Sequence, residues 1–359
     1  MAVKEPIPQQ KSSPREIRYR MTERSGITYR DAGVNIDEGD EMVRRIKPIV
    51  RSTFTPGVLA DIGAFGAFFA PDFAAYDEPV LVSSVDGVGT KLKVAFRAGR
   101  HHSVGQDLVN HCVNDIAVCG ADPLFFLDYY STGRLDADVA VEVVEGFAKA
   151  CRENGVALVG GETAEMPDIY APGEYDLAGT VVGIVSKKNI IDGSRIAEGD
   201  LLFGLPSTGL HTNGYSLARR VLFDRYEVLD SPAELGGETI GDALMKVHRS
   251  YLPLIRAARS YVHAFVHVTG GGIPGNTQRL LPVGVKAEVE YDAWQRPPIF
   301  DLIQSAGGVP EADMRRTFNL GIGLVAVVAA SDRERFVAHA RASADAAVQI
   351  GRIVGDSTR

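Results

Sequence analysis

Residues suited to phosphate chemistry cluster between positions 86 and 91. Asp86, Gly87, Gly89, Thr90 and Lys91 follow an apolar run that is typical of a buried strand. A carboxylate can hold Mg²⁺, glycines let backbone N–H groups approach phosphate oxygens, and a lysine can neutralise the charge on a moving phosphoryl group. The stretch is not a P-loop, because G-x-x-x-x-G-K-[ST] does not occur in it. An ordinary strand-to-turn junction with a solvated Asp and Lys is the alternative.

A second cluster of polar residues lies on the helix that we expect over residues 104–119, with Gly120 as its cap. At 100° per residue, one face of this helix is apolar. The opposite face gathers Asp107, Asn110, His111, Asn114 and Asp115. A solvated face usually carries Lys and Glu, so short acids, amides and a histidine favour contact with a metal or ligand over plain solvation.

Two further loops follow expected strands. The strand over residues 156–159 runs into Gly160, Gly161 and Glu162, so a strand again ends in glycines and a carboxylate. The strand over residues 201–205 enters a loop, residues 206–216, that carries hydroxyls, glycines and His211 before a helix. This loop could bind an anion with His211 as a donor, although a histidine that only packs the loop is the alternative.

A glycine pattern near residue 270 suggests another class of protein. Gly270, Gly272 and Gly275 satisfy G-x-G-x-x-G after an expected strand over residues 262–268, which is the pattern of a dinucleotide site. We discount it, because Pro274 and Pro282 leave room only for a short helix and no βαβ unit on a parallel sheet is evident.

The chain has 359 residues, which is enough for about two domains, each with its own hydrophobic core. We expect a flexible tail over residues 1–27, a loop over 51–69 and a domain boundary within 186–200. The other expected helices span residues 38–50, 138–154 and 242–261, and the other expected strands span 124–130, 177–185 and 324–329.

Composition narrows the class of protein. A net charge of −8 argues against a nucleic-acid partner, because phosphate-backbone binding needs a basic face. The three cysteines, Cys112, Cys119 and Cys151, show no C-x-x-C spacing and are expected to be buried thiols of a reducing compartment. No apolar run is long enough for a membrane span and no signal peptide follows Met1. We therefore expect a cytoplasmic protein without a membrane partner.

Residues 86–91, 160–167, 209–219 and 267–276 together closely resemble the phosphoribosylformylglycinamidine cyclo-ligase family. The resemblance also includes residues 29–39, 114–130 and 316–319, so it covers nearly everything after the tail. Selenophosphate synthetase, thiamine-monophosphate kinase and formylglycinamidine ribonucleotide synthase share the Asp-Gly turn but not segments 160–167 and 211–216 in this form. The chain departs from the family pattern at Arg30, where Lys is frequent, at Ala64 and Ala67, where glycine is frequent, and at Gly275, where a carboxylate is usual.

The resemblance implies an α+β fold of two domains, each a mixed sheet backed by helices. It implies an ATP-binding and dimerisation domain over residues 28–190 and a domain completing the substrate cleft over residues 191–359. It further implies a homodimer whose N-terminal sheets pair into a barrel. The implied reaction closes the imidazole ring of formylglycinamidine ribonucleotide at the expense of ATP, in purine synthesis.

The residue patterns and the family resemblance together predict which residues form the active site. Mg²⁺ is assigned to Asp86, Asp115 and Glu162, and catalysis to Lys91 and His211. ATP contacts are assigned to Asp86, Gly87, Gly89, Thr90, Lys91, Asp107, Asn114, Gly160 and Gly161. Substrate contacts are assigned to His211, Thr212, Asn213 and Ser216. The rivals are a kinase or synthase of the same fold, a non-catalytic nucleotide-binding protein and, more distantly, a dinucleotide oxidoreductase.

Overall fold

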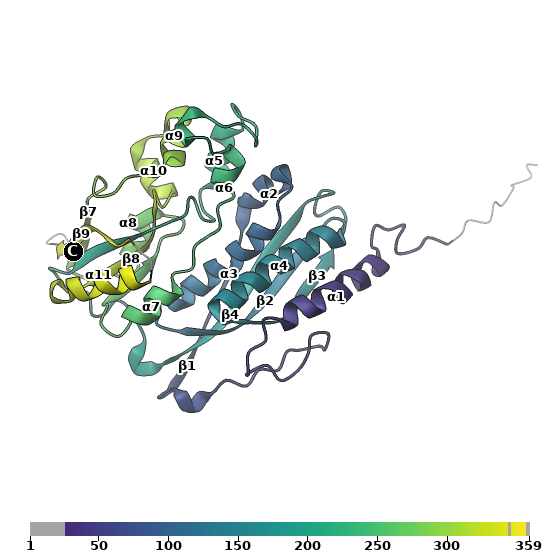
Figure 1. Cartoon of the computed structure of the whole chain (residues 1–359), viewed down its shortest axis with the longest axis horizontal. Coiled ribbons are helices and arrows are strands. Elements are labelled where there is room, and N and C mark those ends of the chain that lie inside the picture. The colour runs from purple at the N-terminus through teal and green to yellow at the C-terminus, as the bar shows by residue number, and fades with distance from the viewer. Residues whose placement is uncertain (1–25, 344–345, 357–359) are drawn as a thin grey trace, which may run out of the picture.

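The chain forms two lobes, each built on its own β-sheet (Figure 1). The computed structural model describes residues 26–343 and 346–356. The tail expected over residues 1–27 therefore lies outside the described residues except for its last two. Within the described part of the chain, no helix is long and apolar enough to cross a membrane.

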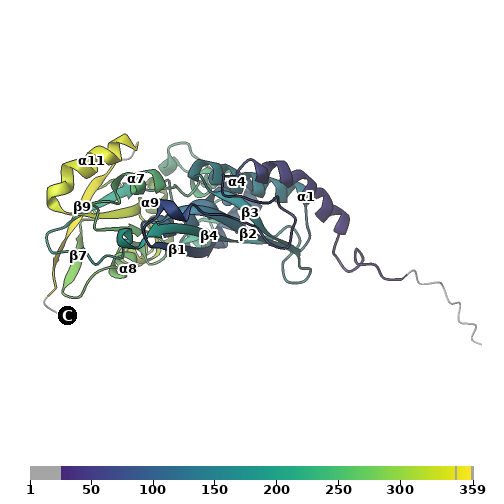
Figure 2. The same cartoon turned by 90° about the horizontal axis from the view of Figure 1, so that it is seen from below.

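The first sheet contains, among the described residues, β1 (Pro79–Gly87), β2 (Asp122–Thr132), β3 (Ala157–Glu165) and β4 (Tyr175–Ser186) in the order β1-β4-β2-β3. β2 and β3 run parallel and the other pairs are antiparallel, so this sheet is mixed, as expected. Helices α1 (Ile36–Arg51), α3 (His102–Ala117) and α4 (Ala137–Asn154) cover one face, as Figure 2 shows for α1 and α4.

Two glycines let α3 and α4 pack closely. A Cβ on Gly105 would lie 2.2 Å from the backbone oxygen of Val143, and one on Gly146 would lie 2.1 Å from that of His102. Either side chain would push the helices apart, which would also move the polar face of α3. The expected helix over 138–154 is confirmed, and Gly155 ends it at φ 68°.

The second face of the first sheet is open to solvent along β1. The expected strand is present there, but the expectation that it is buried is wrong, because exposed and partly buried residues alternate along β1. Leu81 is 57% exposed and Val85 is 67% exposed. An apolar run predicts a strand buried on both faces, but in this chain helices cover only one of them.

The second sheet contains, in the described part of the chain, β5 (Leu201–Pro206), β6 (Ala264–His267), β7 (Val285–Val289), β8 (Ile322–Val328) and β9 (Val348–Gly355). Its order is β6-β8-β5-β9-β7 and every pair in it is antiparallel. The expectation of a mixed sheet in both domains is therefore corrected for this one. An antiparallel sheet also offers no parallel βαβ unit around residues 270–275.

The remaining helices are shorter. They are α2 (Leu92–Ala98), α5 (Tyr215–Leu222), α6 (Ile240–Leu244), α7 (Leu252–Ala258), α8 (Gly272–Gln278), α9 (Pro298–Gly307), α10 (Glu311–Thr317) and α11 (Arg333–Ala342). Single 3₁₀ turns lie at Phe73–Ala75, Gly89–Lys91, Lys187–Asn189, Ala233–Leu235 and Ala330–Asp332. The single helix expected over residues 242–261 is wrong. α6 and α7 are separated by residues 245–251, whose backbone groups bind side chains of α3 instead of one another.

Candidate active site between the two domains

A cleft of about 450 Å³ separates β1 and α3 on one side from β6 and α8 on the other. Asp86 enters it from the end of β1, and His111 and Asp115 enter it from successive turns of α3. His111 Nε2 lies 3.0 Å from Asp86 Oδ2 and 3.8 Å from Asp115 Oδ2. The two carboxylates keep 40% and 27% of their side-chain surfaces exposed, so they can still meet a ligand.

Polar side chains link these two carboxylates through the domain interface. His111 Nδ1 lies 2.8 Å from the hydroxyl of Thr212, which lies 3.3 Å from His248 Nδ1. His248 Nε2 lies 3.0 Å from His267 Nε2, and His267 Nδ1 lies 2.7 Å from Asp115 Oδ1. A continuous chain of hydrogen bonds therefore begins at Asp86 and ends at Asp115.

This chain of hydrogen bonds needs one more proton than its neutral members carry. Five links require five hydrogens, and three neutral imidazoles plus one hydroxyl supply only four when both carboxylates are ionised. Burial by itself lowers the pKa of His111, but the hydrogen bond to Asp86 and the charges of Asp115 and Asp86 outweigh it and raise that pKa above its usual value. The fifth proton therefore belongs on His111.

A charged His111 donates to Asp86 and to Thr212, so the Thr212 hydroxyl is left to donate to His248 Nδ1. His267 Nδ1 donates to the ionised Asp115. His248 Nε2 lies between His267 Nε2 at 3.0 Å and the amide nitrogen of Asn114 at 3.3 Å. Burial holds the pKa of His248 well below its usual value, which agrees with a neutral ring there. Although burial raises the pKa of Asp115, its hydrogen bond from His267 lowers that pKa overall.

Lys91 lies behind the cleft in a buried ion pair. Its Nζ is 2.6 Å from Asp107 Oδ2 and donates to the backbone oxygen of Lys246 at 2.7 Å, and neither Lys91 nor Asp107 is exposed. Burial lowers the pKa of Lys91 and raises that of Asp107, against the attraction between them. The predicted contact of Lys91 with a phosphoryl group would require this pair to open, and its catalytic role stays a prediction.

The polar face of α3 is thus divided between two tasks. His111 and Asp115 face the cleft. Asp107 accepts from the backbone N–H of His248 at 2.7 Å, while Asn114 accepts from Tyr251 N at 2.9 Å and donates to Arg249 O at 2.8 Å. The ATP contacts predicted for Asp107 and Asn114 stay predictions, but both side chains are fully buried in these other bonds.

Gly160, Gly161 and Glu162 lie within β3, which continues to Glu165 instead of ending in a glycine loop. Asp86, Gly179, Asp128 and Gly161 pair across the sheet, so their side-chain positions share one face. Glu162 is the next residue along β3 and therefore projects from the opposite face, on the far edge strand. The structure does not bring Glu162 to Asp86 and Asp115.

His211 is packed inside the loop before α5. It is fully buried at φ 62°, its ring stacks on His248 with 4.0 Å between centroids, and its Nε2 accepts from Thr208 N at 3.3 Å. Its Nδ1 has no hydrogen-bond partner among the described residues. Burial lowers its pKa well below the usual value, so the ring is neutral. His211 lines neither the interdomain cleft nor the second cleft described below.

The other predicted loop residues lie on the path between these clefts. Thr212 belongs to the hydrogen-bond chain, and Asn213 donates to the Thr212 hydroxyl at 3.5 Å. The hydroxyl of Ser216 lies 3.0 Å from that of Thr90, in the turn that follows Asp86 and Gly87. Gly89 and Thr90 are exposed there. The structure therefore brings Thr90 and Ser216 together from different domains.

Sequence reasoning missed several residues that line or support the cleft. His267 and Asn276 lie inside a segment that carries the family resemblance, yet neither was assigned a role. His248 was missed because its segment was expected to be helical. Pro253, in the first turn of α7, was a signal for a break before that helix.

Comparison with known proteins agrees with this two-domain fold. The family model "AIR synthase related protein, N-terminal domain" matches residues 71–185, and the corresponding C-terminal model matches residues 197–359. The thiamine-monophosphate kinase of Stenotrophomonas maltophilia K279a has a similar fold, with a TM-score of 0.66 at 19% identity over 87% of this chain and 94% of that one. HypE of E. coli gives a TM-score of 0.64 at 18% identity, over 89% and 91% of the two chains.

Fold and cleft thus define an AIR synthase related protein of two domains. The chain is 56% identical over 329 residues to the phosphoribosylformylglycinamidine cyclo-ligase of Anaeromyxobacter sp. (strain Fw109-5), covering 91% of this chain and 96% of that relative. It is 50% identical over 332 residues to the enzyme of that name from Nitrosococcus oceani, covering 92% of each. The chain belongs to the phosphoribosylformylglycinamidine cyclo-ligase family of ATP-dependent ligases.

Proposed function

We propose that this chain closes the imidazole ring of formylglycinamidine ribonucleotide, using ATP and releasing 5-aminoimidazole ribonucleotide, ADP and phosphate in purine synthesis. Membership of the family supports the reaction. The observation that carries the proposal is the interdomain cleft, in which two partly exposed carboxylates, Asp86 and Asp115, meet a charged imidazole, His111.

The chemistry explains what the cleft must do. A formyl oxygen is a poor leaving group, so ATP first phosphorylates it. An amidine-side nitrogen then attacks the activated carbon, the C–O bond breaks and phosphate leaves, and the nitrogen loses a proton. The protein has to align the γ-phosphate with the formyl oxygen and neutralise the phosphoryl oxygens.

Asp86 and Asp115 fit a magnesium site. Both offer carboxylate oxygens at the cleft, and both keep lowered pKa values, so they are ionised at neutral pH. When bound, Mg²⁺ would supply positive charge to the transferred phosphoryl group. Gly87, Gly89 and Thr90 form the adjoining turn, whose backbone N–H groups can approach phosphate oxygens. Glu162 is not included, because it projects from the other face of the sheet.

The histidines give the cleft a place to hold a proton. His111 and His267 each bond a cleft carboxylate, and the links through Thr212 and His248 connect them. His111 already carries a proton on Nε2, which faces Asp86. Once that proton has left, Nε2 is the position that can take up a proton released near the ring-closing nitrogen.

The proposal includes a cytoplasmic homodimer that pairs the first sheets of two copies. The open face of that sheet supports it, since Leu81 and Val85 are mostly exposed and Phe69 packs on Phe125 beside them, with ring centroids 5.2 Å apart. Leu81→Asp should convert the dimer to a monomer in sedimentation experiments. A wild-type protein that sediments as a monomer at micromolar concentration would remove this part of the proposal.

The test is formation of 5-aminoimidazole ribonucleotide, measured by its spectroscopic assay, with ATP and Mg²⁺. Asp86→Asn and Asp115→Asn should each lower Mg-dependent turnover, whereas Asp292→Asn, at an exposed aspartate outside the cleft, should not. Undiminished Mg-dependent turnover in Asp86→Asn would remove Asp86 from the metal site. ADP release with another acceptor but not with formylglycinamidine ribonucleotide would favour a kinase or synthase of the same fold.

A further inference from the structure

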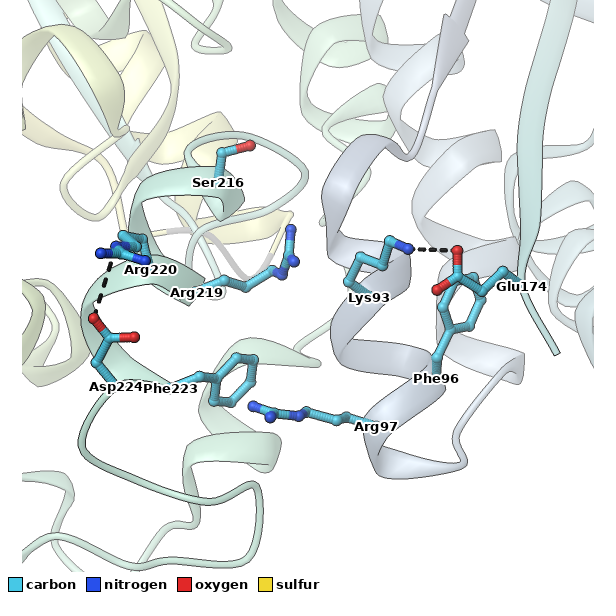
Figure 3. A pocket seen from close by; sticks show the side chains of 9 residues that line it. All are labelled: Lys93, Phe96, Arg97, Glu174, Ser216, Arg219, Arg220, Phe223 and Asp224. Carbon is cyan, nitrogen blue, oxygen red and sulfur yellow. Dashed lines mark hydrogen bonds and ion pairs between the residues drawn. The ribbon is translucent and has the colours of Figure 1, made fainter. Parts of the chain in front are cut away.

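A second cleft, of about 690 Å³, lies between α2 and α5 at the junction of the two domains (Figure 3). Four cationic side chains line it against two carboxylates. The lining residues are Lys93, Phe96, Arg97, Glu174, Ser216, Arg219, Arg220, Phe223 and Asp224. The cleft carries a net positive charge in a chain whose overall charge is −8.

The two carboxylates of this cleft are already engaged. Glu174 pairs with Lys93 at 2.5 Å, and Asp224 lies 3.7 Å from Arg220. Among the residues that the structure describes, no carboxylate pairs with Arg97 or Arg219. Two guanidinium groups therefore remain for an anion.

These guanidinium groups extend toward the cleft from opposite walls (Figure 3). Arg219 projects from α5 toward α2, and Arg97 projects from α2 toward α5, where its Cζ lies 4.4 Å from the ring centroid of Phe223. The aromatic ring restricts the orientation of Arg97 without using its N–H donors in an ion pair. Two planar guanidinium forks on facing walls suit a tetrahedral oxyanion of charge −2.

The second cleft is connected to the interdomain cleft by short contacts. Ser216, at the start of α5, lines the second cleft and meets the hydroxyl of Thr90, four residues after Asp86. Thr212, four residues before Ser216, belongs to the hydrogen-bond chain of the interdomain cleft. The second cleft therefore lies one hydroxyl contact away from the turn that follows Asp86.

We infer that the cleft between α2 and α5 binds the phosphate monoester of the ribonucleotide substrate, with Arg219 and Arg97 as its main ligands. This inference rests on the proposed function. It leaves the reacting formyl end of the substrate in the interdomain cleft near Asp86, and the ATP near Asp86 and Asp115. ATP itself is a poorer occupant of the second cleft, because both carboxylates there are paired with cations and neither is free for Mg²⁺.

The experiment compares the nucleotide substrate with its dephosphorylated nucleoside in wild type, Arg219→Gln and Arg97→Gln. Loss of a charge-assisted contact should raise KM for the nucleotide by about 10- to 100-fold in each variant, with kcat and the KM for ATP little changed. Turnover of the nucleoside should be equally poor in all three proteins. Arg225→Gln is the matched control, because Arg225 is exposed just after α5 and does not line the cleft.

A second probe does not depend on turnover. Ribose 5-phosphate should bind wild type and the Arg225→Gln control in calorimetry, and Arg219→Gln should lose that binding. The inference is overturned if Arg219→Gln and Arg97→Gln keep wild-type KM for the nucleotide, or if they weaken nucleotide and nucleoside turnover equally. Wild type that binds ribose 5-phosphate through Arg219 but makes no 5-aminoimidazole ribonucleotide would refute the proposed function and leave a phosphate monoester site.

Discussion

Lys91 and Asp107 form an ion pair, 2.6 Å between Nζ and Oδ2, that is wholly shielded from solvent at the junction of the two domains. Lys91 comes from the turn after β1, Asp107 comes from α3, and both also bond the backbone of residues 246–248. Charges removed from water are costly unless each has its partner. The pair therefore makes the packing of residues 246–248 against the first domain sensitive to either side chain.

Replacing one partner of this pair should be strongly destabilising. Lys91→Met leaves Asp107 charged and buried without its cation, and we expect it to lower the free energy of unfolding by about 3–5 kcal/mol in urea titrations. Lys187→Met, at an exposed pair with Glu78, should cost about 1 kcal/mol or less. The double variant Lys91→Met, Asp107→Leu should recover part of the loss. If that folded double variant also keeps full turnover, Lys91 has no catalytic role.

Protonation of His111 should make stability depend on pH. Its pKa is raised in the folded protein, so the stabilisation from its proton is complete below the unfolded value of about 6.5 and is lost as the pH rises through the folded value. Without metal, the stability difference between wild type and His111→Gln should therefore shrink as the pH rises above about 6.5. Thermal unfolding over this range tests it. A difference that does not vary with pH would mean that folding leaves the pKa of His111 unchanged.

Magnesium should compete with the proton on His111, because both are attracted by Asp86 and Asp115. The apparent affinity of wild type for Mg²⁺ should rise as the pH rises through the pKa of His111. In His111→Gln the same titration should be nearly independent of pH in that range. Equal pH dependence in both proteins would argue against a shared position for proton and metal.

His211→Ala separates a substrate role from a packing role. Removing a fully buried imidazole that stacks on His248 should cost about 2 kcal/mol or more of stability. If His211 also serves the substrate, kcat/KM for formylglycinamidine ribonucleotide should fall while the affinity for Mg-ATP stays nearly unchanged. A variant that merely melts at a lower temperature, with full kcat/KM, would identify a packing histidine.

Two glycines, Gly161 in β3 and Gly275 in α8, should respond to alanine in opposite ways. A Cβ on Gly161 would lie 2.2 Å from Asp128 Oδ1 and 2.5 Å from its backbone oxygen, so Gly161→Ala should destabilise by about 1–3 kcal/mol. Gly275, inside α8, has nothing within 4 Å of its Cβ position, so Gly275→Ala should stabilise by about 0.5–1 kcal/mol. Denaturant midpoints of the two variants give the comparison, and equal shifts would contradict it.

Local patterns predicted the three long helices α1, α3 and α4 and most of the strands, because their signals lie within each segment. The short helices α2, α9, α10 and α11 and the strands β7 and β9 were not predicted. The apolar period of residues 138–154 and the glycine after it are sufficient to predict α4. The break at residues 245–251 was not predictable in this way. Its cause is a set of side chains on α3, more than 100 residues earlier in the chain, that bind its backbone.

The candidate site was likewise predictable only in part from the sequence. The spacing on α3 marked five polar residues alike as candidates for ligand contact. The structure brings two of them, His111 and Asp115, to the cleft beside Asp86 and turns the other three to the domain interface. Glu162 carried an equally suggestive motif, but which face of a sheet a residue occupies depends on strand register, which no local pattern contains. His248 reaches the cleft only through tertiary packing.

The bonds from α3 to residues 246–251 have a consequence for how this chain can vary. Asp107, Asn110 and Asn114 bind mainly the N–H and C=O groups of that segment, and Asn114 also lies 3.3 Å from the His248 ring. Backbone groups are the same in almost every residue, so an exposed side chain of the segment such as Lys246 can be exchanged without changing these bonds, whereas the buried His248 and Tyr251 cannot. Substitutions of Asp107, Asn110 or Asn114 have no such freedom, because each would leave a backbone group of the segment without its partner.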